Sequence, residues 1–253
     1  MGLRTCILTT VLLGMEFASP AVAQFTSSDV NRSIDRGVQN LLTRRREDGS
    51  FKMGPWLPGH NALGANAYVL YTLVKSGGLP AEDPVIRDLV AYLKQLPIHD
   101  VYDAGTLIMG LDALESSEYD EWIGETAQWI VENEHQGKAG VWAYTGAGGE
   151  PEMSTTQYAV WGLQMAEKNG FPIPTTTWER VVEGTVGRQN DDGGFRYKNG
   201  VWSESSGSMT AAGLFVLHVA LERLNTKPGY TSAKKMGRLR LIEVGLGWSR
   251  DLL

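Results

Sequence analysis

The sequence has a single cysteine in 253 residues, and that residue, Cys6, lies close to the N-terminus. If this leader is removed, the chain has no cysteine left. It then forms no disulfide, carries out no thiol chemistry and builds no cysteine-ligated zinc site. We therefore expect the mature protein to have no metal site and no cofactor.

Long hydrophobic runs are also lacking. Residues 1–23 match a secretory signal peptide: Arg4 gives the positive start, residues 6–13 form a short apolar run, and Ala-Val-Ala at 21–23 is a small-x-small cleavage site. The apolar run is shorter than the roughly 20 residues that a membrane helix needs. We predict a secreted or periplasmic protein with no integral membrane span after cleavage.

Positive charge is scarce as well. The chain carries 23 lysines and arginines against 29 acidic residues, a net charge of -6. Nucleic-acid binding needs a basic surface that can meet phosphate groups, so this class of partner is excluded. A small lipid, a glycan or another protein remains open as the partner.

Alternation of apolar and polar residues with a period of two is missing, whereas helical periodicity recurs along the chain. The sequence therefore predicts an all-α protein. The last expected helix, over residues 239–253, has no following helix with which to form a hairpin. It either caps an open end, or the chain is a truncated relative. The expected helices cover residues 30–46, 62–75, 84–96, 102–114, 119–134, 155–168, 177–189, 209–224 and 239–253.

The helices pair into hairpins whose members differ. Small residues recur in the second helix of each pair, as at Ala104, Gly105, Ala159 and Gly162, and suit a crowded inner ring, although ordinary packing between neighbours also explains them. The first helices carry more charge, which suits an outer ring. A two-helix unit repeating about every fifty residues predicts a solenoid or a ring. We predict one domain over 24–253, with about four and a half hairpins in a partial or complete α/α toroid.

Three turns share a pattern in which a glycine stands two residues before an aromatic side chain. We expect the glycine to allow a positive φ, the aromatic ring to pack back over the turn, and a glutamine to satisfy backbone groups left unpaired at the helix end. These residues are predicted to be structural clamps and not ligand contacts. They are Gly49 and Phe51 (with Arg46 near the glutamine position), then Gln136, Gly140 and Trp142, and finally Gln189, Gly193 and Phe195.

This pattern resembles the QW repeat of the squalene cyclase and prenyltransferase superfamily: glutamine, three residues, glycine, any residue, tryptophan. The turns at 136–142 and 189–195 fit closely, and the turn that ends at Phe51 fits more loosely. The resemblance covers most of residues 30–250 and implies an α/α toroid with outer and inner rings of helices. Uncharacterised exported bacterial proteins with such repeats are the most similar members.

The sequence lacks the motifs that carry the best-known reactions of that superfamily. Its cyclases use an Asp-x-Asp-Asp acid, its protein prenyltransferases bind zinc through Asp, Cys and His, and thioester proteins of similar fold need Cys-Gly-Glu-Gln; none of these elements is present. Asp191 and Asp192 lie in a turn, where aspartates are common for structural reasons. Fold alone does not fix function.

Candidate ligand-binding residues gather where the second helices begin, at the expected mouth of the ring. His60, Tyr102 and Asp103 would form an acid/base set if they converge, and Gln157 lies at the same level. Helix capping is the simpler role for Asp103. Trp202, in the loop over 198–207, is an aromatic residue outside the clamp pattern and a candidate ligand contact.

These observations favour an exported, non-catalytic binding or scaffold toroid, for which a homo-oligomer remains open. The alternative is a divergent enzyme, either terpene-cyclase-like or polysaccharide-lyase-like. A cyclase needs a dry cavity with a lone acid, a polysaccharide enzyme an open polar cleft, and a scaffold an exposed apolar patch.

Overall fold

The computed structural model describes residues 26–54, 62–144, 149–200 and 203–225, and every regular element within these ranges is a helix. The all-α expectation is therefore confirmed for this part of the chain. The expected signal peptide at 1–23 and the expected helix at 239–253 lie outside it. The elements are α1 (Ser27–Leu42), α2 (Ala62–Lys75), α3 (Pro84–Leu93), α4 (Val101–Asp112), the short 3-10 helix η2 (Ser117–Tyr119), α5 (Asp120–Glu132), α6 (Met153–Lys168), α7 (Thr175–Val186) and α8 (Gly207–Asn225).

Capping residues set several helix boundaries that periodicity placed only roughly. Thr26 and Asp29 form a reciprocal capping box, so α1 begins at Ser27, before the first residue of its apolar stripe. Asp83 caps α3, with a proline at the first helical position. Helix α1 ends earlier than predicted because the residues after Leu42 turn back, and the Arg46 N–H donates to the Ser50 carbonyl at 2.8 Å.

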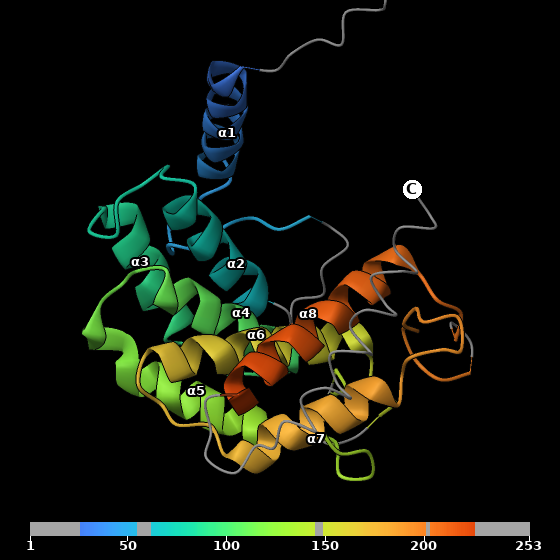
Figure 1. Ribbon diagram of the computed structural model, residues 1–253. Coiled ribbons are helices and arrows are strands. Elements are labelled where there is room, and N and C mark those ends of the chain that lie inside the picture. Colours follow the sequence, from blue (N-terminus) through green and yellow to red (C-terminus); the bar gives the residue numbers. More distant parts are fainter. Residues whose placement is uncertain (1–25, 55–61, 145–148, 201–202, 226–253) are drawn as a thin grey trace, which may run out of the picture.

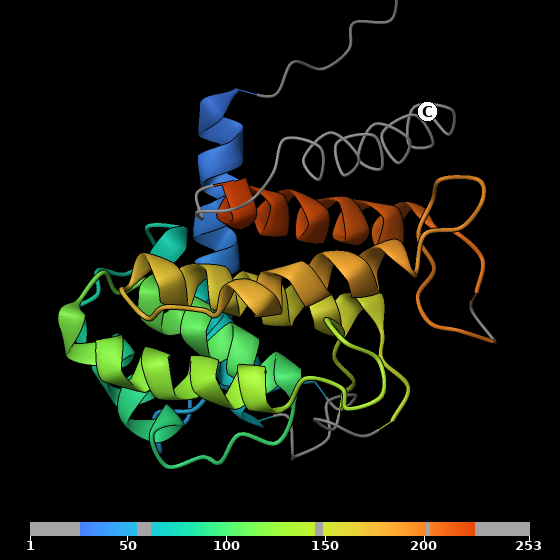
Figure 2. The same cartoon turned by 60° about the horizontal axis from the view of Figure 1, so that its bottom comes forward.

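The helices form two layers. Helices α2, α4, α6 and α8 pack side by side in that order, and we call them the inner row. Helix α3 packs on α2, α5 on α4 and α6, and α7 on α8, so these three helices form an outer layer (Figures 1 and 2). The second helix of each predicted hairpin thus lies in the inner row, and the first of each later pair lies outside.

Small residues bring α4 and α6 together. A Cβ atom on Gly105 would lie 2.6 Å from the Tyr158 carbonyl oxygen, and one on Gly162 would lie 3.2 Å from the Gly105 Cα. A side chain at Gly105 would require a helix to move, and one at Gly162 would require its neighbours to shift by a few tenths of an ångström, because protein interiors are close-packed. At this crossing, small residues therefore set the spacing within the inner row.

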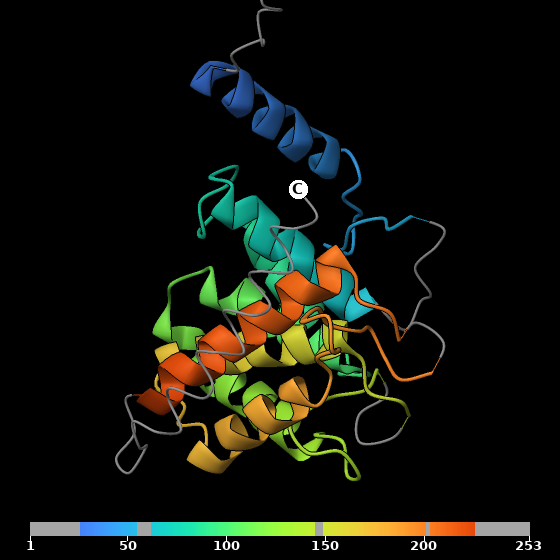
Figure 3. The same ribbon diagram turned by 45° about the vertical axis from the view of Figure 1, so that its right-hand side comes forward.

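Helix α1 stands clear of the body (Figures 1 and 3). Val38 is its buried residue, and Leu41 and Leu42 pack against the core at its C-terminal end. Val30 and Ile34, which continue the apolar stripe, are 51% and 39% exposed. The predicted hairpin of the first two helices is therefore wrong: α1 touches the body near its end and does not pack along α2.

The three turn aromatics are buried, and each is held by the inner-row helix that follows it. The backbone N–H of each aromatic residue donates to a buried polar side chain near the start of that helix. This contact, called the turn staple below, satisfies a buried donor that would otherwise destabilise the fold. The staples join Phe51 to Asn66 Oδ1 at 2.8 Å, Trp142 to Thr156 Oγ1 at 3.2 Å, and Phe195 to Thr210 Oγ1 at 3.0 Å.

The glycines of these turns adopt the left-handed conformation that their predicted role requires. Their φ angles are 84° at Gly49, 73° at Gly140 and 85° at Gly193. Such angles are unfavourable for residues with a Cβ atom. The turns at 44–52 and 188–196 also share an isolated bridge, which joins residue 45 to 51 and residue 189 to 195.

The glutamine role differs among the turns. Gln189 behaves as expected, because its side-chain amide donates to the Gly193 carbonyl at 2.9 Å. Gln136 is exposed, and the Gly140 N–H instead donates to Glu134 Oε1 at 2.6 Å. A carboxylate accepts this bond better than an amide, and it also pairs with Arg180 across to α7. The clamp role predicted for Gln136 therefore belongs to Glu134.

In the first turn, at 44–52, the residue opposite the aromatic ring lies one position earlier than the sequence pattern predicts. Arg45, not Arg46, lies across from Phe51 in the isolated bridge, and its side chain is paired with Asp88 on α3. An arginine at this position reaches the next outer helix, which a glutamine is too short to do.

Replacing Gly140 by alanine is expected to destabilise the protein for two separate reasons. The left-handed backbone costs about 1–2 kcal/mol. The new Cβ atom would also meet the Arg180 carbonyl oxygen at 1.8 Å, and such overpacking adds about 1–3 kcal/mol. Urea unfolding followed by circular dichroism measures the loss.

Gly170 provides the matched control. It has a φ of 87°, but an added Cβ atom would meet nothing within 4 Å. Gly170→Ala is therefore expected to lower the free energy of unfolding only by the cost of the left-handed backbone. Equal losses for the two variants would contradict the close approach of the turn at 136–142 to α7.

Candidate functional site

A hollow of about 370 Å³ opens at the N-terminal ends of the inner helices. It lies between the starts of α2, α4 and α6, which is the place where the sequence analysis put the mouth. Convergence of several elements on one concavity is typical of ligand sites. The lining residues are Gly64, Ala65, Asp100, Tyr102, Asp103, Thr106, Tyr144 and Tyr158.

A larger hollow, of about 1000 Å³, lies against α1. Its described lining belongs to one stretch of that helix, residues 29–36. Among the described residues, no groups from separate elements converge there, so the smaller hollow is the better candidate site.

Asp103 is buried, and both of its carboxylate oxygens are engaged. Oδ1 accepts the N–H of Gly64 in the first turn of α2 at 2.7 Å, and Oδ2 accepts the N–H of His99 at 3.0 Å. Its own N–H donates to Asp100 Oδ1, the cap of α4, at 2.8 Å. Asp103 thus ties the start of α2 to the start of α4, which is the capping role that the sequence analysis favoured.

Burial raises the pKa of the Asp103 carboxyl above its ordinary value, although the two N–H bonds oppose this shift. A carboxylate whose oxygens both hold backbone N–H groups is poorly placed to take a proton from a substrate. The described geometry therefore supports a structural role for this residue.

Tyr102 is half-buried at the centre of the hollow. Its ring centroid lies 4.6 Å from that of Tyr158 and 5.1 Å from that of Tyr144. Burial raises the pKa of the Tyr102 hydroxyl far above that of an ordinary tyrosine. At neutral pH this hydroxyl is protonated, so it can donate a hydrogen bond to a ligand but is not a phenolate base.

The three tyrosines of the hollow continue into a longer series of rings, called the aromatic row below. Tyr158 lies 6.4 Å from Trp161, and Trp161 lies 5.6 Å from Phe215 and 6.5 Å from Tyr71. Tyr71 stacks in turn on Tyr68, which is 48% exposed, while Tyr144 at the other end is 42% exposed. The row is Tyr68 and Tyr71 from α2, Tyr102 from α4, Tyr144 from the loop before α6, Tyr158 and Trp161 from α6, and Phe215 from α8.

Sequence reasoning found Tyr102 and missed the other members of this row. A signal was present, because Tyr68 and Tyr71, like Tyr158 and Trp161, are three residues apart on second helices. Residues at this spacing share one helix face. The two pairs lie on α2 and α6, the inner helices on either side of α4, and place aromatic rings on the same wall.

The other predicted site residues fall in different places. Gln157 is half-buried on α6 beside Tyr158 and is not in the lining of the hollow. His60 and Trp202 lie outside the described residues. The described part of the chain thus brings Tyr102 and Asp103 to one hollow and leaves the proposed acid/base set with His60 untested.

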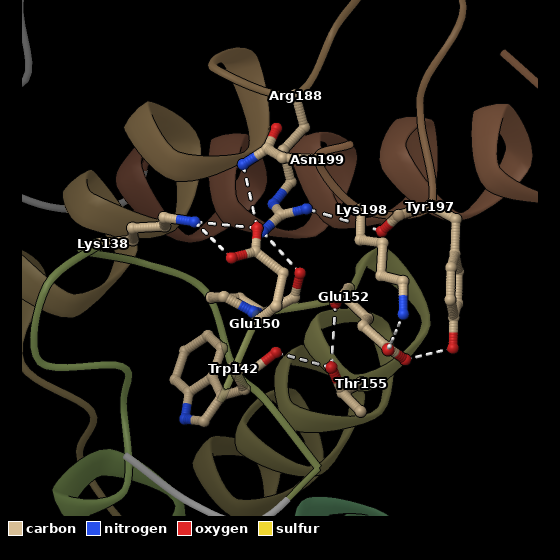
Figure 4. A network of polar contacts seen from close by, with 10 residues as sticks. Lys138, Trp142, Glu150, Glu152, Thr155, Arg188, Tyr197, Lys198 and Asn199 are labelled. Carbon is tan, nitrogen blue, oxygen red and sulfur yellow. Dashed lines mark hydrogen bonds and ion pairs between the residues drawn. The ribbon is translucent and has the colours of Figure 1, made fainter. Parts of the chain in front are cut away.

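A second polar cluster joins the loop before α6 to the loop between α7 and α8 (Figure 4). Glu150 pairs with Lys138 at 2.7 Å and accepts from Asn199 at 3.0 Å. Arg188 is 3% exposed, and burial lowers the pKa of its guanidinium group. It donates to the Pro151 carbonyl at 2.7 Å.

Glu152 completes this cluster at the residue before α6. Its carboxylate accepts from the Tyr197 hydroxyl and lies 3.7 Å from the Lys198 ammonium group (Figure 4). The cluster is satisfied by its own members and anchors the loop that carries Tyr144, so it is structural. Within the described residues no group of His, Cys, Asp and Glu side chains is arranged to hold a metal ion. None of the helices there is long and apolar enough to cross a bilayer.

No family model and no curated protein matches the sequence. Among solved structures, a protein from Actinoplanes is similar over 87% of this chain and 80% of its own, with 15% identity and a TM-score of 0.34. A likeness at this score carries no argument about fold or function.

Asp103→Asn tests the structural role of the carboxylate. An amide nitrogen cannot accept, so one of the N–H groups of Gly64 and His99 would lose its partner, at a cost of about 1–3 kcal/mol. Urea unfolding measures this loss, with Asp191→Asn in an exposed turn as the control. Unchanged stability for Asp103→Asn would show that neither bond contributes.

Tyr102→Phe tests the protonation state of the hollow. The raised pKa means that folded Tyr102 stays neutral where ordinary tyrosines ionise, near pH 10. Its stabilising contribution is complete below that pH and falls as the pH rises further. Absorbance at 295 nm should therefore give the same titration for both proteins while they remain folded. One extra tyrosine titrating near pH 10 in the parent protein would contradict the burial of Tyr102.

Proposed function

We propose that this chain is an exported, non-catalytic binding protein that holds its ligand against the inner row of an α/α toroid of the squalene cyclase and prenyltransferase type. The aromatic row carries the proposal. Seven rings from four helices and one loop form a connected wall that begins in the hollow at the helix ends. A partly exposed aromatic wall with a few placed polar groups is typical of ligand sites.

The toroid is supported by the layering of the helices and by the turns. An inner row with its own outer layer is the local arrangement of such a ring, and the turns at 44–52 and 188–196 share a glycine, a bridge and a turn staple. The QW resemblance predicts these turns. Closure of the ring, the repeat assignment and export through a signal peptide at 1–23 are parts of the proposal.

Binding is favoured over catalysis by the state of the two candidate groups. Asp103 uses both oxygens for backbone N–H groups, and Tyr102 keeps its proton at neutral pH. A lyase acting on an acidic polysaccharide needs a cation to neutralise the substrate carboxylate. The described lining of the hollow holds two aspartates and no Lys, Arg or His.

Two alternatives draw on other features. Asp103 is a buried acid with a raised pKa beside tyrosine rings, which is what a terpene-cyclase-like enzyme would need. A scaffold would use the exposed apolar stripe of α1 at Val30 and Ile34, and a second copy of the chain could cover it.

Native mass spectrometry of the chain recovered from a bacterial periplasm separates these functions. We expect a retained small-molecule adduct on the parent protein and on Tyr119→Ala, a control outside the aromatic row, and its loss from Tyr158→Ala. A bare parent chain that assembles into dimers would contradict the proposal and favour the scaffold. An adduct that both variants keep would place binding away from the row.

A further inference from the structure

We infer that the ligand of the aromatic row is a neutral oligosaccharide, bound with one end in the tyrosine hollow and the rest along the row. This inference rests on the proposed binding function and names the chemical class of its ligand.

The site spans several helices, because the hollow and the row are continuous. Tyr102 and Tyr158 line the hollow, and Tyr158 lies against Trp161 in the middle of the row. From Trp161 the rings branch to Phe215 on α8 and to Tyr71 on α2. A ligand that lies against the rings of α2, α4 and α6 must therefore reach across three inner helices, as a chain of sugar units does.

The rings of this site have polar tips. Five of the seven members of the aromatic row are tyrosines, each with an apolar face and a hydroxyl that donates and accepts hydrogen bonds. Sugars match such a surface, since one face of the ring presents C–H groups and the edge presents hydroxyls. A lipid chain would bury these hydroxyls without partners, which is unfavourable.

The charge of the hollow distinguishes neutral sugars from anionic ones. Asp100 and Asp103 line it, and no cationic residue does so within the described part of the chain. Anionic sugars such as uronic acids would be repelled by these carboxylates. Neutral sugars carry no charge and avoid this repulsion.

A proline-rich peptide is the main rival for a surface lined by aromatic rings. Such a peptide offers carbonyl acceptors and few N–H donors, because proline has no backbone N–H. The tyrosine hydroxyls of the row both donate and accept hydrogen bonds, and such a peptide offers them few donors. A sugar, whose hydroxyls also do both, therefore matches the row better.

Isothermal titration of the exported chain against six-unit oligosaccharides and two probes that are not sugars tests the inference. The probes are β-1,4- and α-1,4-linked glucose, β-1,4-linked N-acetylglucosamine, galacturonic acid, decaproline and palmitate. We expect at least one neutral sugar to bind with a Kd of about 10 µM to 1 mM, and hexagalacturonate to bind at least about tenfold more weakly.

The variants locate the bound sugar. Trp161→Ala should weaken binding at least about tenfold, and Trp161→Phe should restore part of the loss because it keeps an aromatic face. Trp122→Ala removes a half-buried tryptophan from α5 in the outer layer and should leave the Kd unchanged. Circular dichroism confirms that each variant is folded. Neutral-sugar binding that survives Trp161→Ala would overturn the inference.

The other outcomes separate this inference from the binding function on which it rests. Tighter binding of hexagalacturonate, decaproline or palmitate than of every neutral sugar overturns the sugar assignment and leaves the binding function standing. If the protein binds no probe but carries a periplasmic adduct that contains no sugar, the sugar assignment is also overturned and the binding function stands. Failure of all the probes together with a bare parent chain overturns both.

Discussion

The rest of the structure depends on the turn staples, the hydrogen bonds from the turn aromatics to the inner row. An aromatic side chain can be buried at a turn only if its own backbone N–H, carried inward with it, finds an acceptor. A side chain from the following inner helix supplies that acceptor, so burial of the ring also fixes the start of that helix. Asn66, Thr156 and Thr210 are the acceptors on α2, α6 and α8.

The fixed helix starts explain why a site can form at this end of the molecule. Each staple sets the level of one inner helix, Asp103 ties α2 to α4, and the glycines at the α4–α6 crossing set the distance between those helices. Rings on neighbouring helices then come within 7 Å of one another, as at Tyr102 and Tyr158. The relative positions of the inner helices therefore bring the rings of the aromatic row together without a bound ligand.

The sequence predicted the helical class, the turn glycines and the buried turn aromatics, because each of these depends on local chemistry within a few residues. It did not predict the turn staples, since Thr156 and Trp142 are 14 residues apart in the chain and an ordinary threonine has no distinctive signal. Gln136 was misjudged for a similar reason: Glu134 gained the contact through a partner on α7. The candidate hollow was located through Tyr102, whereas the full row required knowledge of which helices are neighbours.

Amide hydrogen exchange, followed by nuclear magnetic resonance, tests the turn staples most directly. If the staples hold the turns, the amides of Phe51, Trp142 and Phe195 exchange as slowly as those of the inner helices, although they lie in turns. We also expect that Thr156→Val, which keeps the shape of the side chain and removes the acceptor, exposes the Trp142 amide while the other two stay protected. Exchange of all three amides at the rate of open loops in the parent protein would contradict the account.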